Sequence, residues 1–407
     1  MRRKLTLAML AMMSMACLAQ KTVSISVENK AKTDRMKAPV VIQLEKYGMN
    51  VRKAVVTLDG KEIPCQLDDI NGDKRMDELC FLADMERKSK KVFSITLCEE
   101  GEQKEYTPEV YVEMLLTNRK VKSTNKQDLY ISELKVDRGV NPYWMLHHHG
   151  AAFENSMVGY RIYFDHRQTI DIYGKYKEGL ELRDTQFYPD EQQKAAGYGD
   201  DVLWVGQTFG LGALRGWNGK EPTMVSDVEH RSQRIVARGP LRTIVEVKDE
   251  GWKPQEGNEP IDMTMLYTLY AGQRDCDVDV TFSKKADGYL FSTGIINVKN
   301  STEYSDKQGL RGCWGKDWPV SAKDSVGHKR ETVGLGIYIP AKYVKSEEVA
   351  NKDNYGYVLS TPTDKLSYKI TFGSDNEQFG YHNAEDWYTY LQQWKKEIEQ
   401  PLIIKEL

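Results

Sequence analysis

Strict alternation of apolar and polar residues over short segments is the feature that most constrains how this chain can fold. It occurs in residues 23–27, 277–282 and 366–372. Successive side chains of a strand point to opposite faces, so each segment predicts a strand with one buried face, as in antiparallel sheets. Asp59-Gly60 and Asn71-Gly72 are turn signals between such runs. No segment resembles a βαβ unit, and we predict an all-β protein.

A charged, apolar-poor segment, residues 98–105, marks a predicted domain boundary. We predict a small N-terminal β-sandwich over residues 20–108 and a large antiparallel β-sandwich over residues 109–407. One helix is expected near the C-terminus, where Asn383 can cap it and Pro401 stops it. Its apolar residues recur at helical spacing and predict a face docked onto a sheet: Trp387, Tyr390, Leu391, Trp394 and Ile398.

The first nineteen residues have the pattern of a cleaved export signal rather than of a folded element. Arg2-Arg3-Lys4 precedes an apolar run over residues 5–16, and Cys17 and Ala19 are small residues suited to a cleavage site. That run is too short to cross a bilayer, which needs about 20 residues. We predict a signal peptide over residues 1–19 and a periplasmic location, with lipid anchoring through Cys17 as the alternative. No later segment is apolar enough to span a membrane.

The charge balance and the cysteine content indicate which partners to expect and whether the thiols are free, paired or bound to metal. Lys and Arg total 57 against 60 Asp and Glu, so no basic excess exists to neutralise phosphates and we expect no nucleic-acid partner. The cysteines after the signal peptide form no CxxC pair: Cys65, Cys80, Cys98, Cys276 and Cys313. We therefore expect buried free thiols rather than a zinc site or a disulfide framework, with one Cys65–Cys80 bridge as the alternative.

One acidic loop has the oxygen spacing of a calcium site. Its candidate ligands occupy relative positions 1, 3, 5 and 9: Asp69, Asn71, Asp73 and Asp77. Cys80 stands where a helix-loop-helix site has a bidentate glutamate, and Lys74 and Arg75 add positive charge. We predict an Asx-rich turn here, with a structural calcium ion as the alternative, and no other cofactor.

The densest group of polar and aromatic residues lies between residues 143 and 175. If residues 160–165 form a strand, Arg161, Tyr163 and Asp165 share one face, opposite the face of Tyr160, Ile162 and Phe164. We considered two hairpin registers, one with Arg161 opposite Lys175 and one with Arg161 opposite Tyr173. Either register gathers cations, phenols and carboxylates on one face. The alternative is a solvated face with weak salt bridges.

Three successive histidines favour acid–base chemistry over a metal site. Adjacent strand residues alternate in direction, so at most His147 and His149 could converge, too few ligands for zinc. A general acid or base role is expected for one histidine of the group. The glycine-rich segment 199–212 lacks a phosphate-binding motif and predicts turns near a site. Trp314 lies in a tryptophan-rich loop that could cover a cleft, with core packing as the alternative.

Several strings resemble a family of exported Bacteroidota proteins of unknown function that are encoded among polysaccharide-utilisation genes. They are segment 67–82, His148-His149-Gly150, residues 160–165 and residues 170–175. The resemblance covers nearly the whole mature chain and implies that the large domain is a mutarotase-like β-sandwich. The family is associated with an ulvan oligosaccharide dehydratase, which eliminates water from a non-reducing terminal uronate.

We therefore predict a carbon–oxygen lyase, a dehydratase or polysaccharide lyase, that acts on acidic, uronate-containing oligosaccharides by β-elimination. This reaction needs a cation beside the carboxylate, a base and an acid. The candidate catalytic residues, with base and acid left open, are His148, His149, Tyr160, Tyr163 and Arg161. The candidate substrate-binding residues are Lys175, Asp165, Glu154, Tyr173 and Trp314. The alternatives are a glycoside hydrolase that uses Glu154 and Asp165, or a glycan-binding sandwich without activity. The sequence does not indicate the oligomeric state.

Overall fold

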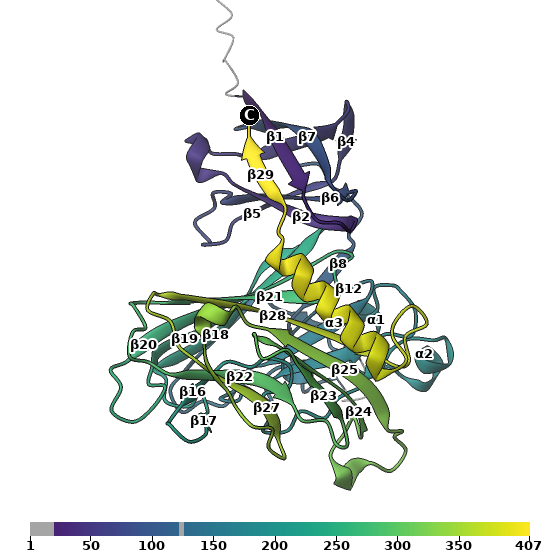
Figure 1. Cartoon of the computed structure of the whole chain (residues 1–407), viewed down its shortest axis with the longest axis vertical. Coiled ribbons are helices and arrows are strands. Elements are labelled where there is room, and N and C mark those ends of the chain that lie inside the picture. The colour runs from purple at the N-terminus through teal and green to yellow at the C-terminus, as the bar shows by residue number, and fades with distance from the viewer. Residues whose placement is uncertain (1–19, 122–125) are drawn as a thin grey trace, which may run out of the picture.

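The computed structural model describes residues 20–121 and 126–407, and the predicted signal peptide over residues 1–19 lies outside this part. The described chain is mostly strand and forms a small unit above a large one (Figure 1). The pairings between its named strands are antiparallel, so the predicted all-β class is confirmed. None of the described helices is long and apolar enough to cross a membrane.

The N-terminal unit consists of two packed sheets. The first has the order β29 (Ile403–Glu406), β1 (Gln20–Asn29), β7 (Ser89–Cys98), β3 (Lys53–Leu58) and β4 (Lys61–Ile63). The second has the order β2 (Arg35–Gln43), β6 (Glu78–Met85) and β5 (Cys65–Asp68). Alternate residues of both sheets, such as Val27, Val56 and Phe81, fill the core between them. The described cysteines are free thiols, so the alternative of a Cys65–Cys80 bridge is wrong.

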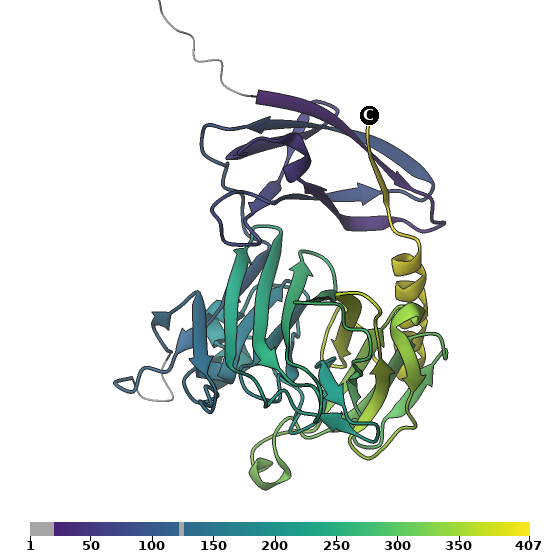
Figure 2. The ribbon, with the colours of Figure 1, turned by 90° about the vertical axis from the view of Figure 1, so that its left-hand side faces the viewer.

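The last strand of the chain belongs to the N-terminal unit, which corrects the predicted domain division. β29 pairs with β1, with Ile25 opposite Glu406 and Glu28 opposite Ile403. The prediction had assigned these residues to the large domain, because a four-residue strand carries no local sign of its distant partner. Figure 2 shows that the C-terminal segment, in yellow, runs as a helix along one side of the large unit before it reaches this sheet.

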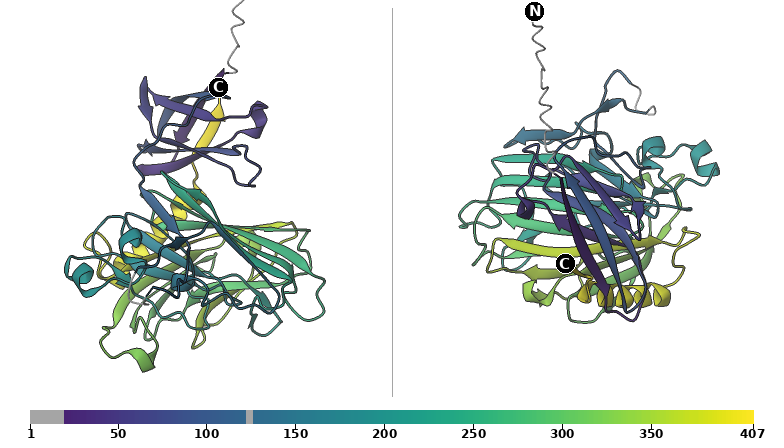
Figure 3. Two further views of the ribbon diagram at one scale, coloured as in Figure 1. Left: turned by 180° about the vertical axis from the view of Figure 1, so that it is seen from behind. Right: turned by 90° about the horizontal axis from the view of Figure 1, so that it is seen from above.

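The large unit encloses one main core between a wide sheet and two smaller ones. The wide sheet has the order β11 (Glu133–Asp137), β18 (His230–Arg238), β19 (Arg242–Trp252), β20 (Ile261–Tyr270), β21 (Asp275–Phe282), β28 (Lys365–Ser374), β25 (Glu331–Tyr338), β24 (Leu310–Asp317) and β23 (Thr302–Ser305). Viewed from above, these strands run side by side beneath the N-terminal unit (Figure 3).

The two smaller sheets of the large unit have five strands each. One has the order β15 (Asp200–Asp201), β14 (Ile170–Gly174), β13 (Val158–Tyr163), β12 (Gly150–Asn155) and β8 (Val110–Glu113). The other has the order β17 (Pro222–Thr223), β16 (Arg215–Trp217), β22 (Phe291–Ile296), β27 (Asn354–Leu359) and β26 (Val344–Glu347). The remaining short elements are the pair β9 (Leu115–Leu116) and β10 (Leu129–Tyr130), and the 3-10 turns η1 (Glu45–Tyr47), η2 (His147–His149), η3 (Ala322–Asp324) and η4 (Ala341–Tyr343).

The predicted C-terminal helix is confirmed as α3 (Ala384–Glu399). Asn383 caps it by accepting a hydrogen bond from the Asp386 amide at 2.9 Å, and Trp387 and Leu391 are buried against the wide sheet. Trp314 lies on β24 beneath this helix, with its ring 6.4 Å from that of Trp387, so it packs in the core and does not cover a cleft. Two short helices, α1 (Leu182–Thr185) and α2 (Glu191–Ala195), were not predicted.

Candidate active site

The hairpin of β13 and β14 places the central charged residues of the site. Its register sets Arg161 opposite Asp171 and Ile162 opposite Ile170. Both predicted registers are therefore wrong, because residues 164–169 form a longer connection than either assumed. The observed register places a cation directly across from an anion, which stabilises the pair of strands. The predicted faces are correct, since Ile162 lies in the core while Arg161 and Tyr163 share the other side.

Arg161 is the hub of a polar network. Its Nη2 lies 2.6 Å from Asp171 Oδ2 and 2.7 Å from Asp201 Oδ2. Its Nη1 donates to Tyr188 Oη at 2.8 Å, and the guanidinium lies 4.1 Å from the Phe187 ring centroid. One guanidinium thus faces two carboxylates. Tyr188 and Asp201 were missed by the sequence analysis, because they come from segments that only the fold brings to this hairpin.

Burial raises the pKa of two groups in this network. Burial, together with the nearby Asp171 carboxylate, raises the pKa of Asp201 well above its usual range, and Arg161 opposes this shift. Burial likewise raises the pKa of the Tyr163 phenol, again against the pull of Arg161. The Tyr163 hydroxyl donates to Asp171 Oδ2 at 2.9 Å. The Asp201 side chain retains 17% of its exposure and can therefore meet a ligand as a neutral acid.

The three histidines form a 3-10 turn before β12 rather than a strand, which corrects the expected alternation. His148 and His149 have positive φ angles of 45° and 69°. Gly150 follows because a Cβ there would lie 1.8 Å from the Ile162 carbonyl oxygen. The rings of His147 and His148 contact each other with centroids 5.2 Å apart, whereas the ring of His149 stacks on Tyr143.

His149 carries the geometry of a general base. Its Nδ1 lies 3.0 Å from the carbonyl oxygen of Tyr143, which can only accept, so Nδ1 holds the proton and Nε2 keeps its lone pair. The ring stacks on Tyr143 with centroids 3.8 Å apart and meets the edge of Tyr163 at 5.9 Å. Burial, helped by the Arg161 charge, lowers the pKa of His149 to about 4. The imidazole is neutral at physiological pH and only partly buried.

His148 points inward and is fully enclosed. Its Nε2 lies 3.2 Å from Glu113 Oε1, and its Nδ1 has no hydrogen-bond partner among the described residues. Burial lowers the pKa of His148 to about 3 and raises the pKa of Glu113 to about 7. The predicted catalytic contact of His148 is therefore corrected: it supports the turn that carries His149 and does not reach a ligand.

Arg167, also missed from the sequence, completes the open face. Asp165 holds it through both Nε and Nη2, at 2.7 and 2.6 Å, so the predicted ligand contact of Asp165 is replaced by a positioning role. The guanidinium lies 4.6 Å from the Tyr143 ring centroid and 5.0 Å from that of Tyr163. Exposed aromatic side chains, Trp144 at 74% and Tyr188 at 44%, form the rim.

Four other predicted site residues are enclosed in the protein. The ion pair of Lys175 and Glu154 has no exposed side-chain surface, and Glu154 also accepts from the amides of Glu181 and Leu182. The buried Tyr173 hydroxyl donates to Glu181 Oε2 at 3.0 Å. The buried Tyr160 hydroxyl donates to the carbonyl of Arg274 at 2.9 Å. Roles in ligand contact predicted for Lys175, Glu154, Tyr173 and Tyr160 are thus corrected to structural ones.

The acidic loop of the N-terminal unit is an Asx-rich turn, as predicted. Asp69 accepts from the amides of Gly72 and Lys74, and Asp77 accepts from the amides of Ile70 and Asn71. Asn71 and Asp73 similarly accept from the amides two residues further along the chain. Across residues 20–121 and 126–407, no group of three or more His, Cys, Asp or Glu side chains is arranged to hold a metal ion. Calcium binding at this loop stays an untested alternative.

Comparisons with known proteins give one family and a fold. The family model described as "Domain of unknown function (DUF4861)" matches residues 27–404. Among solved structures, an alpha-mannosidase from Enterococcus faecalis V583 is similar at 10% identity and TM-score 0.50, over 95% of this chain and 46% of that one. A Glycosyl Hydrolase Family 38 protein from Enterococcus faecalis has 9% identity and TM-score 0.47, over 95% and 47%.

These similarities concern the fold. The chain spans about half the length of the two solved chains, and at this level of identity the first of them shows a shared architecture alone. No curated protein matches the sequence significantly.

Proposed function

The chain belongs to the family described as a domain of unknown function (DUF4861), and we propose that it is an enzyme that acts on uronate-containing oligosaccharides by β-elimination. The reaction is dehydration of a non-reducing terminal uronate or lyase cleavage at the same carbon. The fold shared with an alpha-mannosidase is consistent with a carbohydrate ligand. The side chains of the candidate active site support the reaction itself.

The tautomer of His149 is the observation that carries this proposal. The carbonyl of Tyr143 fixes the proton on Nδ1, so Nε2 keeps its lone pair and can act as a base without any prior proton transfer. The pKa of about 4 makes the free imidazole a weak base. A bound uronate brings a negative charge next to the ring, which raises that pKa and strengthens the base when substrate is present.

The remaining groups complete a balanced elimination. His149 Nε2 takes the proton at C5, and the electrons of that bond form the C4=C5 double bond. The oxygen at C4 leaves with its bonding electrons and takes a proton from Asp201, whose raised pKa keeps it protonated. Arg167 lies beside the His149–Tyr163 pair and neutralises the substrate carboxylate, while Arg161 is engaged by Asp171, Asp201 and Tyr188.

Product analysis tests the proposal. The full chain is incubated with uronate-terminated oligosaccharides from ulvan and rhamnogalacturonan, and ultraviolet absorbance and mass are followed. Formation of an unsaturated uronate with loss of one water per chain is the result expected of a dehydratase, and the same double bond with a shorter chain is that expected of a lyase. Chain shortening without a double bond would contradict the proposal.

A non-catalytic glycan-binding protein is the second candidate, favoured by the exposed rings of Trp144 and Tyr188 at the rim of the site. It predicts binding without any product, with affinity unchanged in His149→Ala. The third alternative, hydrolysis by Glu154 and Asp165, loses its support because Glu154 is enclosed and Asp165 is held by Arg167.

A further inference from the structure

A cavity of about 530 Å³ lies next to the site in the large unit. The loop of residues 204–208 forms one side of it, and the turns around Asn297 and Asp353 form the other. None of the groups assigned to the elimination lines this cavity. Its position and its lining residues nevertheless suit it to bind another part of the oligosaccharide that occupies the candidate active site.

The loop that lines the cavity is fixed to the loop that carries Arg167. Buried Arg215 donates to the carbonyl of Gln207 at 2.9 Å and to Thr169 Oγ1 at 3.1 Å. It also reaches the carbonyl of Arg167 at 3.3 Å, and Arg167 Nη1 lies 3.4 Å from the carbonyl of Gly206. The cavity and the candidate active site are therefore two sides of one braced segment, so a single oligosaccharide can contact both.

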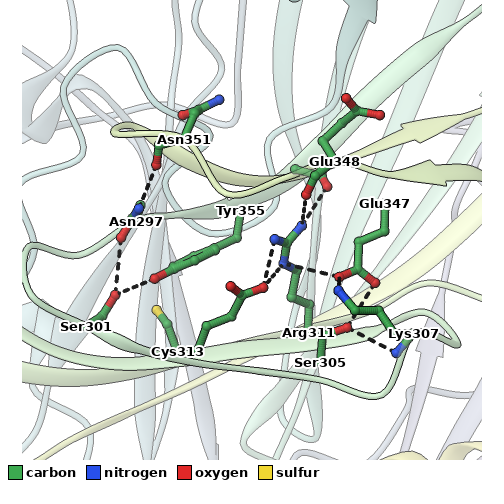
Figure 4. A network of polar contacts seen from close by, with 12 residues as sticks. Asn297, Ser301, Ser305, Lys307, Arg311, Cys313, Glu347, Glu348, Asn351 and Tyr355 are labelled. Atoms are coloured by element: carbon green, nitrogen blue, oxygen red, sulfur yellow. Dashed lines mark hydrogen bonds and ion pairs between the residues drawn. The ribbon is translucent and has the colours of Figure 1, made fainter.

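The far wall is pre-organised as well. Asn297 Nδ2 donates to the carbonyl of Asn351 at 2.6 Å, and its Oδ1 accepts from Ser301 Oγ at 3.3 Å. Ser301 Oγ lies 2.9 Å from Tyr355 Oη, and Figure 4 shows this chain of contacts beside the ion pairs of Arg311. A wall that is already ordered loses little conformational entropy when a ligand binds.

The charged side chains of the lining form no ion pairs within the described residues, although Asp317 Oδ1 accepts from the Trp318 amide at 2.8 Å. Lys299, Lys352, Asp317 and Asp353 supply two charges of each sign. An ionic ligand of either sign would meet as much repulsion as attraction. A hydroxyl group both donates and accepts, so a ligand with several hydroxyls can satisfy this mixture.

Trp204 adds an aromatic platform at the same place. Its side chain is 48% exposed although it lines the cavity. A Cβ added at Gly206, where φ is 52°, would lie 3.5 Å from Trp204 Nε1, so the indole rests close over the glycine. An exposed indole beside hydrogen-bonding groups is the usual arrangement for the apolar face of a sugar ring.

We propose that this cavity binds an uncharged, hydroxyl-rich sugar unit adjacent to the uronate held at His149. That a uronate occupies the adjacent site at His149 rests on the proposed function. Binding of the sugar unit in the cavity does not require turnover.

Calorimetry with the full chain tests the proposal, using uronate-terminated rhamnogalacturonan oligosaccharides of two, four and six units, in which the unit next to the uronate is an uncharged rhamnose. In the wild type the Kd is expected to fall roughly tenfold as the chain grows into the cavity, about the contribution of one stacked ring with its hydrogen bonds. Trp204→Ala and Lys352→Ala should lose this gain, while Trp204→Phe should retain most of it. Lys345→Ala, which removes an exposed and unpaired lysine elsewhere, is the matched control.

The outcomes separate this inference from the proposed function. An equal dependence of Kd on chain length in Trp204→Ala and the wild type overturns the cavity proposal, even if unsaturated product forms. A length dependence that disappears in Trp204→Ala supports it, even if no product forms and the elimination is thereby refuted. Absence of binding to every oligosaccharide contradicts both.

Discussion

Two buried charge networks on the sheet of β12, β13 and β14 differ in their access to solvent. In the enclosed network, Lys175 and Glu154 have no exposed side-chain surface, and the Glu154 oxygens are engaged by Lys175 and two backbone amides. In the open network, Arg161 faces two carboxylates and Asp201 remains 17% exposed. The enclosed network balances its charges internally, whereas the open one holds a second carboxylate, Asp201, whose pKa is raised by burial and by Asp171.

This difference separates residues that support the fold from residues that can act on a ligand. Each network joins a cation to one or more carboxylates, so the presence of charged residues in the sequence does not distinguish them. The comparison predicts that changes in the open network alter turnover with little change in stability, and that changes in the enclosed network do the reverse.

Asp201→Asn should have the largest effect in the open network. The proton donor is removed, so kcat/KM is expected to fall by about 10²- to 10⁴-fold. Since burial already favours the neutral form of Asp201, a neutral amide of the same shape should leave the Tm nearly unchanged. Steady-state kinetics and thermal unfolding of one preparation check both statements, and full activity in Asp201→Asn would remove this residue from the mechanism.

Lys175→Met should have the largest effect in the enclosed network. It leaves the Glu154 carboxylate buried without its cation, which costs about 3–5 kcal/mol of unfolding free energy. The double variant Glu154→Leu/Lys175→Met removes both charges and should be more stable than the single variant. Denaturant unfolding measures the difference. A single variant as stable as the wild type would show that this pair does not support the fold.

Glu113→Gln tests a second enclosed pair through its pH dependence. The folded pKa of Glu113 is raised to about 7 by burial, so the folded state binds a proton that the unfolded state releases near its ordinary value. Stability therefore falls as the pH rises through this window, by up to about 3 kcal/mol. Glutamine cannot ionise, so the Tm of the variant relative to the wild type should rise between pH 5 and pH 8. A constant difference would contradict the assigned pKa.

His148 acts on stability in the opposite direction. Its folded pKa of about 3 means that only the unfolded state takes up a proton as the pH falls below the ordinary histidine value. Its contribution is therefore lost progressively below about pH 6.5, in the wild type and in Glu113→Gln alike, so this loss largely cancels in the difference between the two proteins.

Arg167→Gln should have the smallest effect of the set. Loss of the cation beside the uronate carboxylate is expected to lower kcat/KM by roughly tenfold to a hundredfold, mostly through KM if the contact forms in the ground state. Arg138→Gln is the control, since Arg138 also pairs with an aspartate, Asp227, but is half exposed. Equal kinetics in the two variants would exclude Arg167 from binding the carboxylate.

The parts of the fold that depend on local periodicity were predictable from the sequence. Alternation of apolar and polar residues predicted the all-β class. The capping residue Asn383 and the apolar residues at helical spacing after it predicted α3. The faces of β13 followed from alternation, but its register did not, because the length of the connection over residues 164–169 depends on bonds such as that of Asp165 to Arg167.

The composition of the site was only partly predictable. His149, Tyr163 and Arg161 were found from their local density. Tyr188 and Asp201 reach Arg161 from 27 and 40 residues away along the chain, and no local sequence pattern predicts such contacts. Burial of Glu154 and Lys175 could not be predicted either, because the sequence of a charged pair is the same whether the pair faces solvent or the core.

The most direct test of the account is the turnover and stability of His149→Ala, measured beside His328→Ala. His328 is an exposed histidine whose ring makes no contact with the site in the described structure. The account predicts that His149→Ala abolishes formation of unsaturated uronate while its Tm stays close to that of the wild type, and that His328→Ala changes neither. Undiminished formation of unsaturated product by a folded His149→Ala protein would contradict it.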